Sequence, residues 1–411
     1  MSSARAALVP LLAFGASYLY LYANVVEQDD ICRHKRPPRL RFRATLPRID
    51  TTNDTTNDTD AAHPSTPGRY VPYYLRKAPD NSTEMPRILI WTTLQDYWFP
   101  GSRTRGSGIT IYCGDMKCLL TNDRYSLDST EAVVFYGLDL DLSDMPPYRA
   151  RAQKWVFWTM EAPSCDDNEM MLLGPAINWT LTYRLDSDYK VTYGLIAEHD
   201  QPFAYSMEAL RLLWQGKRRM AVWPVSHCHT YGRRELFVRE LRKHIDVDIV
   251  GNCGKQGCRD NCWHNFSSEY FFYLSFENKP CRDYVTEKLY NPLDHDIVPV
   301  VFGGADYAYV APRGSYVDAL SFSSPAALAR YLVATSRDFG MYARHFAWKG
   351  RYKVMHWYGW DLCPICRAIP TEAFRNHSHY HDIHHWHVTM ARCRSWDPRT
   401  FKMRTSECNQ G

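Results

Sequence analysis

Two nucleotide-binding motifs are absent from this chain of 411 residues. No G-x-x-x-x-G-K-[S/T] string occurs, and no G-x-G-x-x-G follows an expected strand. A P-loop NTPase or a NAD-dependent dehydrogenase is therefore poorly supported. The net formal charge is only +4 and no long Lys/Arg stripe is present, which argues against a nucleic-acid partner. No internal repeat is visible either, and the length favours two or three domains.

A further absence marks the N-terminus, because residues 6–26 include no Asp, Glu, Lys or Arg. That stretch is long enough to cross a bilayer as a helix. Arg5 precedes it and Glu27, Asp29 and Asp30 follow, so the positive-inside rule places the N-terminus in the cytosol and the rest in the lumen. A cleaved signal peptide is the alternative, but no clear A-x-A site follows. We expect a cytosolic tail at 1–5 and a single-pass type II anchor at 6–26.

Residues 27–86 have few side chains that a core could bury. Thr, Asp, Pro and Arg dominate, and the run TTNDTTNDTD is almost wholly polar. Such a segment cannot offset its ordering entropy, so we expect a disordered, glycosylated stem. Sequons for N-glycosylation occur in the stem and beyond it, and they imply lumenal exposure. The candidate acceptors are Asn53, Asn57, Asn81, Asn178, Asn265 and Asn376.

The 13 cysteines favour an oxidising compartment, where disulfides are stable. Zinc is the competing interpretation, since two close pairs could form a four-ligand site. The odd number leaves at least one cysteine without a partner inside the chain. The clustered cysteines are Cys113 and Cys118; Cys253, Cys258 and Cys262; and Cys363 and Cys366.

Short apolar runs alternate with helical periodicity after residue 86. Helical patterns occupy 234–245 and 324–335, the second beginning with Ser and Pro. This alternation predicts an α/β fold with parallel sheets. A helical segment within 195–216 could connect two α/β halves. The expected strands are 88–92, 132–136, 155–160, 220–225, 247–250, 271–276 and 297–302.

Two loops that follow expected strands carry polar side chains. Ligands bind beyond the carboxyl ends of strands in such sheets, so these loops are the places to look for chemistry. Glu161 follows one strand, and Thr286, Glu287 and Lys288 open an expected helix after another. A helix N-terminus with a lysine suits a diphosphate. An ordinary Glu–Lys pair on a solvated helix face would show the same spacing.

Three strings in order resemble the signature of the α1,3/4-fucosyltransferase family, which is glycosyltransferase family 10. They are FYLSFEN at 272–278, DYVTEKL at 283–289 and VPVVFG at 298–303. The strings WTMEAPS at 158–164, NWTLTYRLDSD at 178–188 and VSHC at 225–228, the last followed by Arg234, agree in order. The resemblance extends over residues 87–370. It departs from the family pattern at His227, where Asn is common, and at Ala162, where Ser is common.

The resemblance implies a GT-B architecture, with two Rossmann-like domains facing a cleft and one transmembrane helix before them. Residues 87–215 would be the acceptor domain and residues 216–345 the GDP-fucose-binding domain. Residues 346–411 would form a C-terminal tail, in which the family's C-x-x-C cysteines, here Cys363 and Cys366, form structural disulfides. The histidines of this tail could bind metal, but we expect a solvated, partly protonated segment.

The motif match also implies roles for individual residues. Glu161 would be the general base. Arg234 and Lys288 would bind the diphosphate with Tyr284 beside it, and Glu287 would hydrogen-bond the ribose. The remaining residues that would line the nucleotide site are Tyr273, Asn278 and Ser226.

The implied reaction is inverting α1,3-fucosyl transfer from GDP-β-L-fucose to a GlcNAc hydroxyl of a glycoprotein glycan. The acceptor could be an N-glycan core or a Lewis-type antenna.

No cofactor is expected, because two cations can offset the negative charge that grows on the leaving group, and a divalent metal would at most stimulate the reaction. Asp186 and Asp188 are the best D-x-D candidate, yet turn or capping hydrogen bonds are the expected role. A Golgi membrane location and a homodimer also fit. Another nucleotide sugar, or an inactive sugar-binding lumenal protein, is the alternative.

Overall fold

The computed structural model describes residues 85–92, 108–149, 152–164, 167–254, 262–356, 361–376 and 378–405. The predicted anchor at 6–26, the sequons at Asn53, Asn57 and Asn81, and Cys258 lie outside the described residues. Within the described ranges, no helix combines the length and apolar character that a membrane crossing needs. The anchor therefore stays a prediction.

The first sheet has seven strands in the order β2-β3-β1-β4-β5-β6-β7. Neighbouring strands run parallel, except for the antiparallel hairpin of β2 and β3. The strands are β1 Arg87–Ile90, β2 Gly108–Cys113, β3 Met116–Thr121, β4 Ala132–Tyr136, β5 Lys154–Thr159, β6 Trp179–Thr182 and β7 Tyr189–Lys190. Strands β1, β4 and β5 confirm predicted strands, whereas the hairpin and β6 were not predicted.

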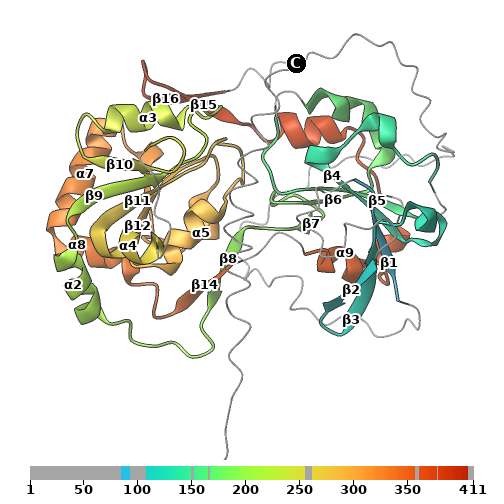
Figure 1. The fold of residues 1–411 in the computed structure, drawn as a ribbon, viewed down its shortest axis with the longest axis horizontal. Coiled ribbons are helices and arrows are strands. Elements are labelled where there is room, and N and C mark those ends of the chain that lie inside the picture. Colours follow the sequence, from blue (N-terminus) through green and yellow to red (C-terminus); the bar gives the residue numbers. More distant parts are fainter. Residues whose placement is uncertain are drawn as a thin grey trace, which may run out of the picture. The chain divides into compact units, whose positions relative to one another are not determined.

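The C-terminal part of the chain packs on both faces of this first sheet. Helix α9 (Cys363–Ala368) buries Ile365 and Cys366 against one face, and Figure 1 shows this red helix beside the blue-to-teal strands β1–β3. On the other face, Trp386 packs with Met170 and Leu173. Burial of these apolar side chains explains why the chain returns to the first sheet.

Disulfides hold this returning segment in place. Cys113 pairs with Cys363, and Cys118 pairs with Cys366, across sequence separations of 250 and 248 residues. The zinc interpretation is wrong for these four cysteines, because each sulfur is already bonded to another. The other described pairs are Cys228–Cys253 and Cys281–Cys393, and Cys262 is also disulfide-bonded.

The second sheet has five parallel strands in the order β10-β9-β11-β12-β13. It confirms four predicted strands and adds the short edge strand β13. The α/β prediction is thereby confirmed, and both sheets belong to the same compact unit of the chain. The strands are β9 Arg219–Pro224, β10 Val247–Val250, β11 Tyr270–Phe276, β12 Val298–Phe302 and β13 Val317–Asp318.

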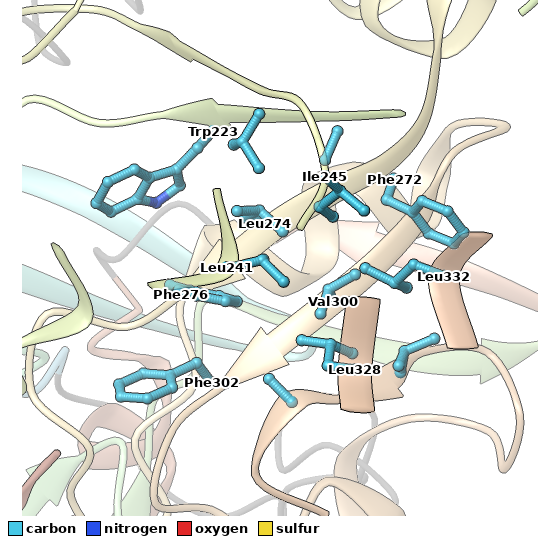
Figure 2. Close-up of a cluster of buried hydrophobic side chains, with 14 of the residues drawn as sticks. Trp223, Leu241, Ile245, Phe272, Leu274, Phe276, Val300, Phe302, Leu328 and Leu332 are labelled. Atoms are coloured by element: carbon cyan, nitrogen blue, oxygen red, sulfur yellow. The ribbon is translucent and has the colours of Figure 1, made fainter. Parts of the chain in front are cut away.

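Helices cover both faces of the second sheet (Figure 1). One face packs against α2 Met207–Gly216, α3 Arg234–Leu241, α7 Pro325–Arg337 and α8 Phe339–Ala343. Figure 2 shows Leu241 of α3 and Leu328 of α7 against Phe276 and Val300 of the strands. The opposite face packs against α4 Cys262–Glu269 and α5 Glu287–Asp294.

Local sequence explains where these helices begin and end. The Ser324 side chain caps α7 and Pro325 occupies its first turn, as predicted. Helix α3 is shorter than the predicted 234–245, because turns replace it after Leu241, although Ile245 stays buried. Helix α5 ends two residues after Pro292, which lacks an N–H to continue it.

Two antiparallel pairs complete the described structure: β8 Gly194–Glu198 with β14 Tyr352–His356, and β15 Arg394–Asp397 with β16 Lys402–Thr405. Short helices α6 Tyr307–Val310 and α10 Glu372–Arg375 lie between larger elements. The predicted connecting segment 195–216 contains most of β8 and helix α2.

Candidate active site

Glu161 is held by two tyrosine hydroxyls at the carboxyl end of β5. Its backbone N–H donates to Thr159 Oγ1 at 3.1 Å, which fixes the turn out of the strand. Tyr193 Oη donates to Glu161 Oε1 at 2.9 Å, and Tyr284 Oη donates to Oε2 at 2.8 Å. The residue is half-buried, so the carboxylate is oriented by donors without being sealed from solvent.

Burial and the charge of Glu161 raise the pKa values of four tyrosines. They are Tyr136, Tyr183, Tyr193 and Tyr284, which come from different elements. Burial raises the pKa of each phenol, and the nearby carboxylate raises it further. These hydroxyls therefore keep their protons at neutral pH, and those of Tyr193 and Tyr284 donate to the carboxylate.

The loop after β11 reaches the loops of the first sheet. Besides the bond from Tyr284 to Glu161, Lys279 Nζ donates to the carbonyl of Ala162 at 3.2 Å. Asp283 accepts from the backbone N–H of Leu185 at 3.2 Å. Two segments that the sequence analysis marked separately, after β5 and after β11, thus form one site.

Helix α5 begins at this site with a cluster of charged side chains. Thr286 caps the helix, and Lys288 Nζ lies 3.0 Å from both Thr286 Oγ1 and Glu287 Oε1. Burial alone would raise the pKa of Glu287, but the charge and hydrogen bond of Lys288, together with hydrogen bonds from the Glu287 backbone and from Thr286, lower the pKa. The predicted helix start at 286–288 is confirmed, while its diphosphate role stays a prediction.

Glu277 is a buried carboxylate beside this cluster that the sequence analysis left without a role. It is 1% exposed, accepts hydrogen bonds from Thr286 N at 2.9 Å and from Thr286 Oγ1, and lies 3.7 Å from Lys288 Nζ. Burial raises its pKa, and Lys288 opposes the increase. A carboxylate directly after a buried strand was the signal that could have identified it.

Arg234 lies buried where α3 begins, and its guanidinium donates to the backbone carbonyls of Phe276 and His227. Asn278 follows Phe276, and its carbonyl accepts from Gly232 N at 2.9 Å. A Cβ on Gly232 would lie 2.4 Å from Pro280 Cδ, so this approach requires glycine. Arg234 and Asn278 thus meet at the carboxyl ends of β9 and β11, and Ser226 follows β9 at the same edge.

Tyr273 is the predicted site residue that the structure does not bring to this edge. It lies within β11, is 6% exposed, and stacks on Trp263 with ring centroids 5.3 Å apart. Strand alternation directs it to the face covered by α4, away from Phe272 and Leu274. Its place in an aromatic core argues against the predicted role in lining the nucleotide site.

A cavity of about 310 Å³ lies at the opposite edge of the second sheet. It is lined by the amino ends of β9 and β10, where Arg219 and Asp248 pair at 2.9 Å. Ligands of parallel sheets bind at the carboxyl ends, so this cavity is not the candidate site.

Comparison with known proteins agrees with the signature strings. The model "Fucosyltransferase, N-terminal" matches residues 83–194, and "Glycosyltransferase family 10 (fucosyltransferase) C-term" matches residues 214–386. Alpha-(1,3)-fucosyltransferase C of Drosophila melanogaster is 33% identical over 341 residues, which cover 75% of this chain and 79% of that protein. The chain belongs to the family 10 fucosyltransferases. The resemblance seen in the sequence is therefore confirmed.

Another relative of this fucosyltransferase-family chain is glycoprotein 3-alpha-L-fucosyltransferase A of Drosophila melanogaster. It is 30% identical over 354 residues, which cover 82% of this chain and 66% of that protein. A crystal structure of an α1,3-fucosyltransferase with GDP-fucose matches with a TM-score of 0.45 and 14% identity, covering 76% of this chain and 98% of that one. The family assignment rests on the sequence matches.

The D-x-D candidate of this family member has structural partners. Asp186 pairs with the fully buried Arg184 at 2.6 Å and with Arg282 at 3.3 Å. Asp188 accepts hydrogen bonds from Thr180 and Tyr380. Over the ranges that the structure describes, no three His, Cys, Asp or Glu side chains are grouped to hold a metal ion. Metal independence stays a prediction.

The histidine-rich segment corrects one expectation about this fucosyltransferase. We expected a solvated tail, yet His384 and His387 are buried, and the π-helical turn η9 (His385–Thr389) packs on the first sheet. The His387 ring lies 5.0 Å from that of Phe157, edge to face. Burial, and then the charges of Arg184 and Lys279, lower the pKa of His387 to about 3. Alternating apolar residues, not the histidines, decided this packing.

One predicted glycosylation site conflicts with the fold. The Asn178 amide is buried, accepts from Trp155 N at 2.9 Å and donates to the carbonyl of Ser378 at 2.8 Å. A glycan would have to replace that second hydrogen bond in a buried position, so the structure argues against Asn178 as an acceptor. Asn265 and Asn376 are exposed, so they stay candidates.

Proposed function

We propose that this chain is an inverting α1,3-fucosyltransferase that moves L-fucose from GDP-β-L-fucose to a GlcNAc hydroxyl of a glycoprotein glycan. The observation that carries the proposal is the 2.8 Å hydrogen bond from Tyr284 to Glu161. It joins a carboxylate at the carboxyl end of β5 to the loop that leads into α5 and Lys288. A base and a diphosphate-binding cation from separate sheets are thereby brought into one site, as a GT-B enzyme requires.

The leaving group determines what the second sheet must supply. As the bond between the fucose anomeric carbon and the diphosphate oxygen breaks, negative charge grows on GDP. The Lys288 ammonium and the positive end of the α5 dipole stabilise that charge, with Arg234 nearby at the start of α3. One charge-assisted contact contributes on the order of 1.5–3 kcal/mol. Glu277 and Glu287 hold the Lys288 ammonium in place.

The acceptor determines what the first sheet must supply. A sugar hydroxyl becomes a good nucleophile only as it loses its proton, and the Glu161 carboxylate takes that proton as the new carbon–oxygen bond forms. A positioned base of this kind contributes roughly 10²–10⁴ in rate. Displacement from the face opposite GDP inverts the anomeric centre, so no covalent fucosyl-enzyme is formed. Two cations replace the metal that other glycosyltransferases hold with a D-x-D motif.

The location and the acceptor class belong to the same proposal. The uncharged run at 6–26 supports a type II anchor in the Golgi membrane, with the catalytic part in the lumen. The four described disulfides suit that oxidising compartment. A glycoprotein acceptor is supported by the name of the second Drosophila relative, glycoprotein 3-alpha-L-fucosyltransferase A.

Turnover with competing donors tests the proposal. The full chain is assayed with GDP-fucose, GDP-mannose and UDP-galactose on an N-glycan core and on a Lewis-type precursor, with and without EDTA. We expect transfer from GDP-fucose alone, at a rate that EDTA leaves within about twofold, and loss of at least about 10² in kcat for Glu161→Gln. Transfer from another donor, or full activity in Glu161→Gln, would refute the assignment.

A further inference from the structure

Tyr193 contacts the candidate base, although no signature string includes it. It lies between β7 and β8, and its hydroxyl is 2.9 Å from Glu161 Oε1 and 3.2 Å from the carbonyl of Met160. Its single proton is donated to Glu161, because this contact is shorter and a carboxylate is the stronger acceptor. Burial and the charges of Glu161 and Glu287 raise the pKa of Tyr193, so the hydroxyl stays a donor.

Each carboxylate oxygen of Glu161 accepts one of these tyrosine hydrogen bonds. Tyr193 occupies Oε1 and Tyr284 occupies Oε2, and the two tyrosines come from loops of different sheets. Each carboxylate oxygen can accept two hydrogen bonds, so each keeps one acceptor site for an incoming hydroxyl. Two donors at opposite ends also fix the rotation of the carboxylate, which neither could do alone.

We propose that Tyr193 is a positioning residue for Glu161, which sets the orientation of the base during fucosyl transfer. The inference rests on the proposed function. A base that is held in place needs no reorganisation when the acceptor arrives, and small misplacements of such groups are costly in rate.

The test uses the full chain and variants that each remove a single oxygen atom. Tyr193→Phe deletes one donor, Tyr284→Phe deletes the other, and Tyr189→Phe is the matched control on β7, where its ring contacts Trp179. The measurements are kcat and the KM for GDP-fucose. We expect Tyr193→Phe to lower kcat about tenfold at an unchanged KM for GDP-fucose, while the control matches the wild type in both.

The outcomes separate the inference from the proposed function. No fucosyl transfer by the wild type, or full activity of Glu161→Gln, overturns the function itself. An active wild type that depends on Glu161, with a folded Tyr193→Phe that keeps its kcat, overturns only the inference. If Tyr193→Phe does not fold, the kcat of Tyr284→Phe decides: a fall in kcat supports the two-donor arrangement, and an unchanged kcat refutes it.

Discussion

The carboxylate of Glu277 accepts from both hydrogen-bond donors of Thr286. The backbone N–H lies 2.9 Å from Oε1, and the hydroxyl lies 3.0 and 2.9 Å from the two oxygens. The end of β11 is thereby tied to the residue that caps α5, with Lys288 Nζ 3.7 Å from the same carboxylate. Glu277 thus determines where the cationic end of α5 lies relative to the sheet.

Replacing Glu277 tests that attachment. Glu277→Ala leaves the buried donors of Thr286 without a partner, so we expect the free energy of unfolding to fall by about 3 kcal/mol. Glu277→Gln keeps an acceptor for Thr286, and its cost should stay within about 1 kcal/mol. Urea unfolding with disulfides intact measures both variants. Equal stability of the two would show that the hydrogen bonds to Thr286 contribute little.

Replacing Lys288 tests the charge at the start of α5. Lys288→Ala should lower kcat/KM for GDP-fucose by about 10- to 100-fold, because one charge-assisted contact to the diphosphate is lost. Lys353→Ala is the matched control. Lys353 lies on β14 and pairs at 3.5 Å with the exposed Asp200. Steady-state kinetics with varied GDP-fucose gives the result. A folded Lys288→Ala with unchanged kcat/KM would contradict the diphosphate role.

Buried His387 should make the fold sensitive to acid. Its pKa is lowered from 6.5 to about 3 in the folded protein, so the unfolded chain binds more protons below pH 6.5. The free energy of unfolding therefore decreases as pH falls from 6.5 toward 3, by up to about 1.4 kcal/mol per pH unit, and this contribution is constant above 6.5.

Unfolding measured from pH 7 to 4 checks this prediction. His387→Gln, which has no titrating ring, should show a shallower loss of stability than the wild type. His379→Gln is the matched control, because His379 is exposed in the same segment. If His387→Gln and the wild type lose stability with the same slope, the histidine is not the source of the acid sensitivity.

The pairing of the C-x-x-C cysteines also has a measurable consequence. Cys366→Ala removes the bond to Cys118, which closes a loop of 248 residues, and should cost about 2–5 kcal/mol. Peptide mapping of the unreduced wild type should recover Cys113 joined to Cys363. Recovery of Cys363 joined to Cys366 would show that the pairing is wrong, whatever the stability result.

Much of the fold was predictable because the central strands are short runs of apolar β-branched or aromatic residues. Strands β4 and β10 have the predicted bounds, and β11 and β12 differ from theirs by one residue. Strand β6 is buried as well but was missed, since two of its four residues are Thr. The other missed elements lack the apolar pattern. The hairpin of β2 and β3 alternates polar and apolar residues at a sheet edge, and β8 pairs with a strand far along the chain.

The candidate site was predictable in part. Signature strings identified Glu161, Arg234, Glu287 and Lys288, and each lies at the carboxyl edge of a sheet. Tyr273 was assigned to the same edge but lies in the core. Glu277 could have been singled out as a carboxylate directly after a buried strand, but its contact with Thr286 could not be predicted. Tyr193 could not be assigned, because its role depends on a contact between segments that periodicity and spacing do not relate.

The sequence by itself determined the family, the α/β class and most central strands, because these depend on local patterns of apolar residues and on ordered strings. Only the tertiary structure decided that Cys363 and Cys366 bond to β2 and β3, that His387 is buried, and that Tyr193 and Tyr284 share Glu161. Such contacts depend on how distant segments pack, and packing satisfies all buried groups at once, which no single stretch of sequence can specify.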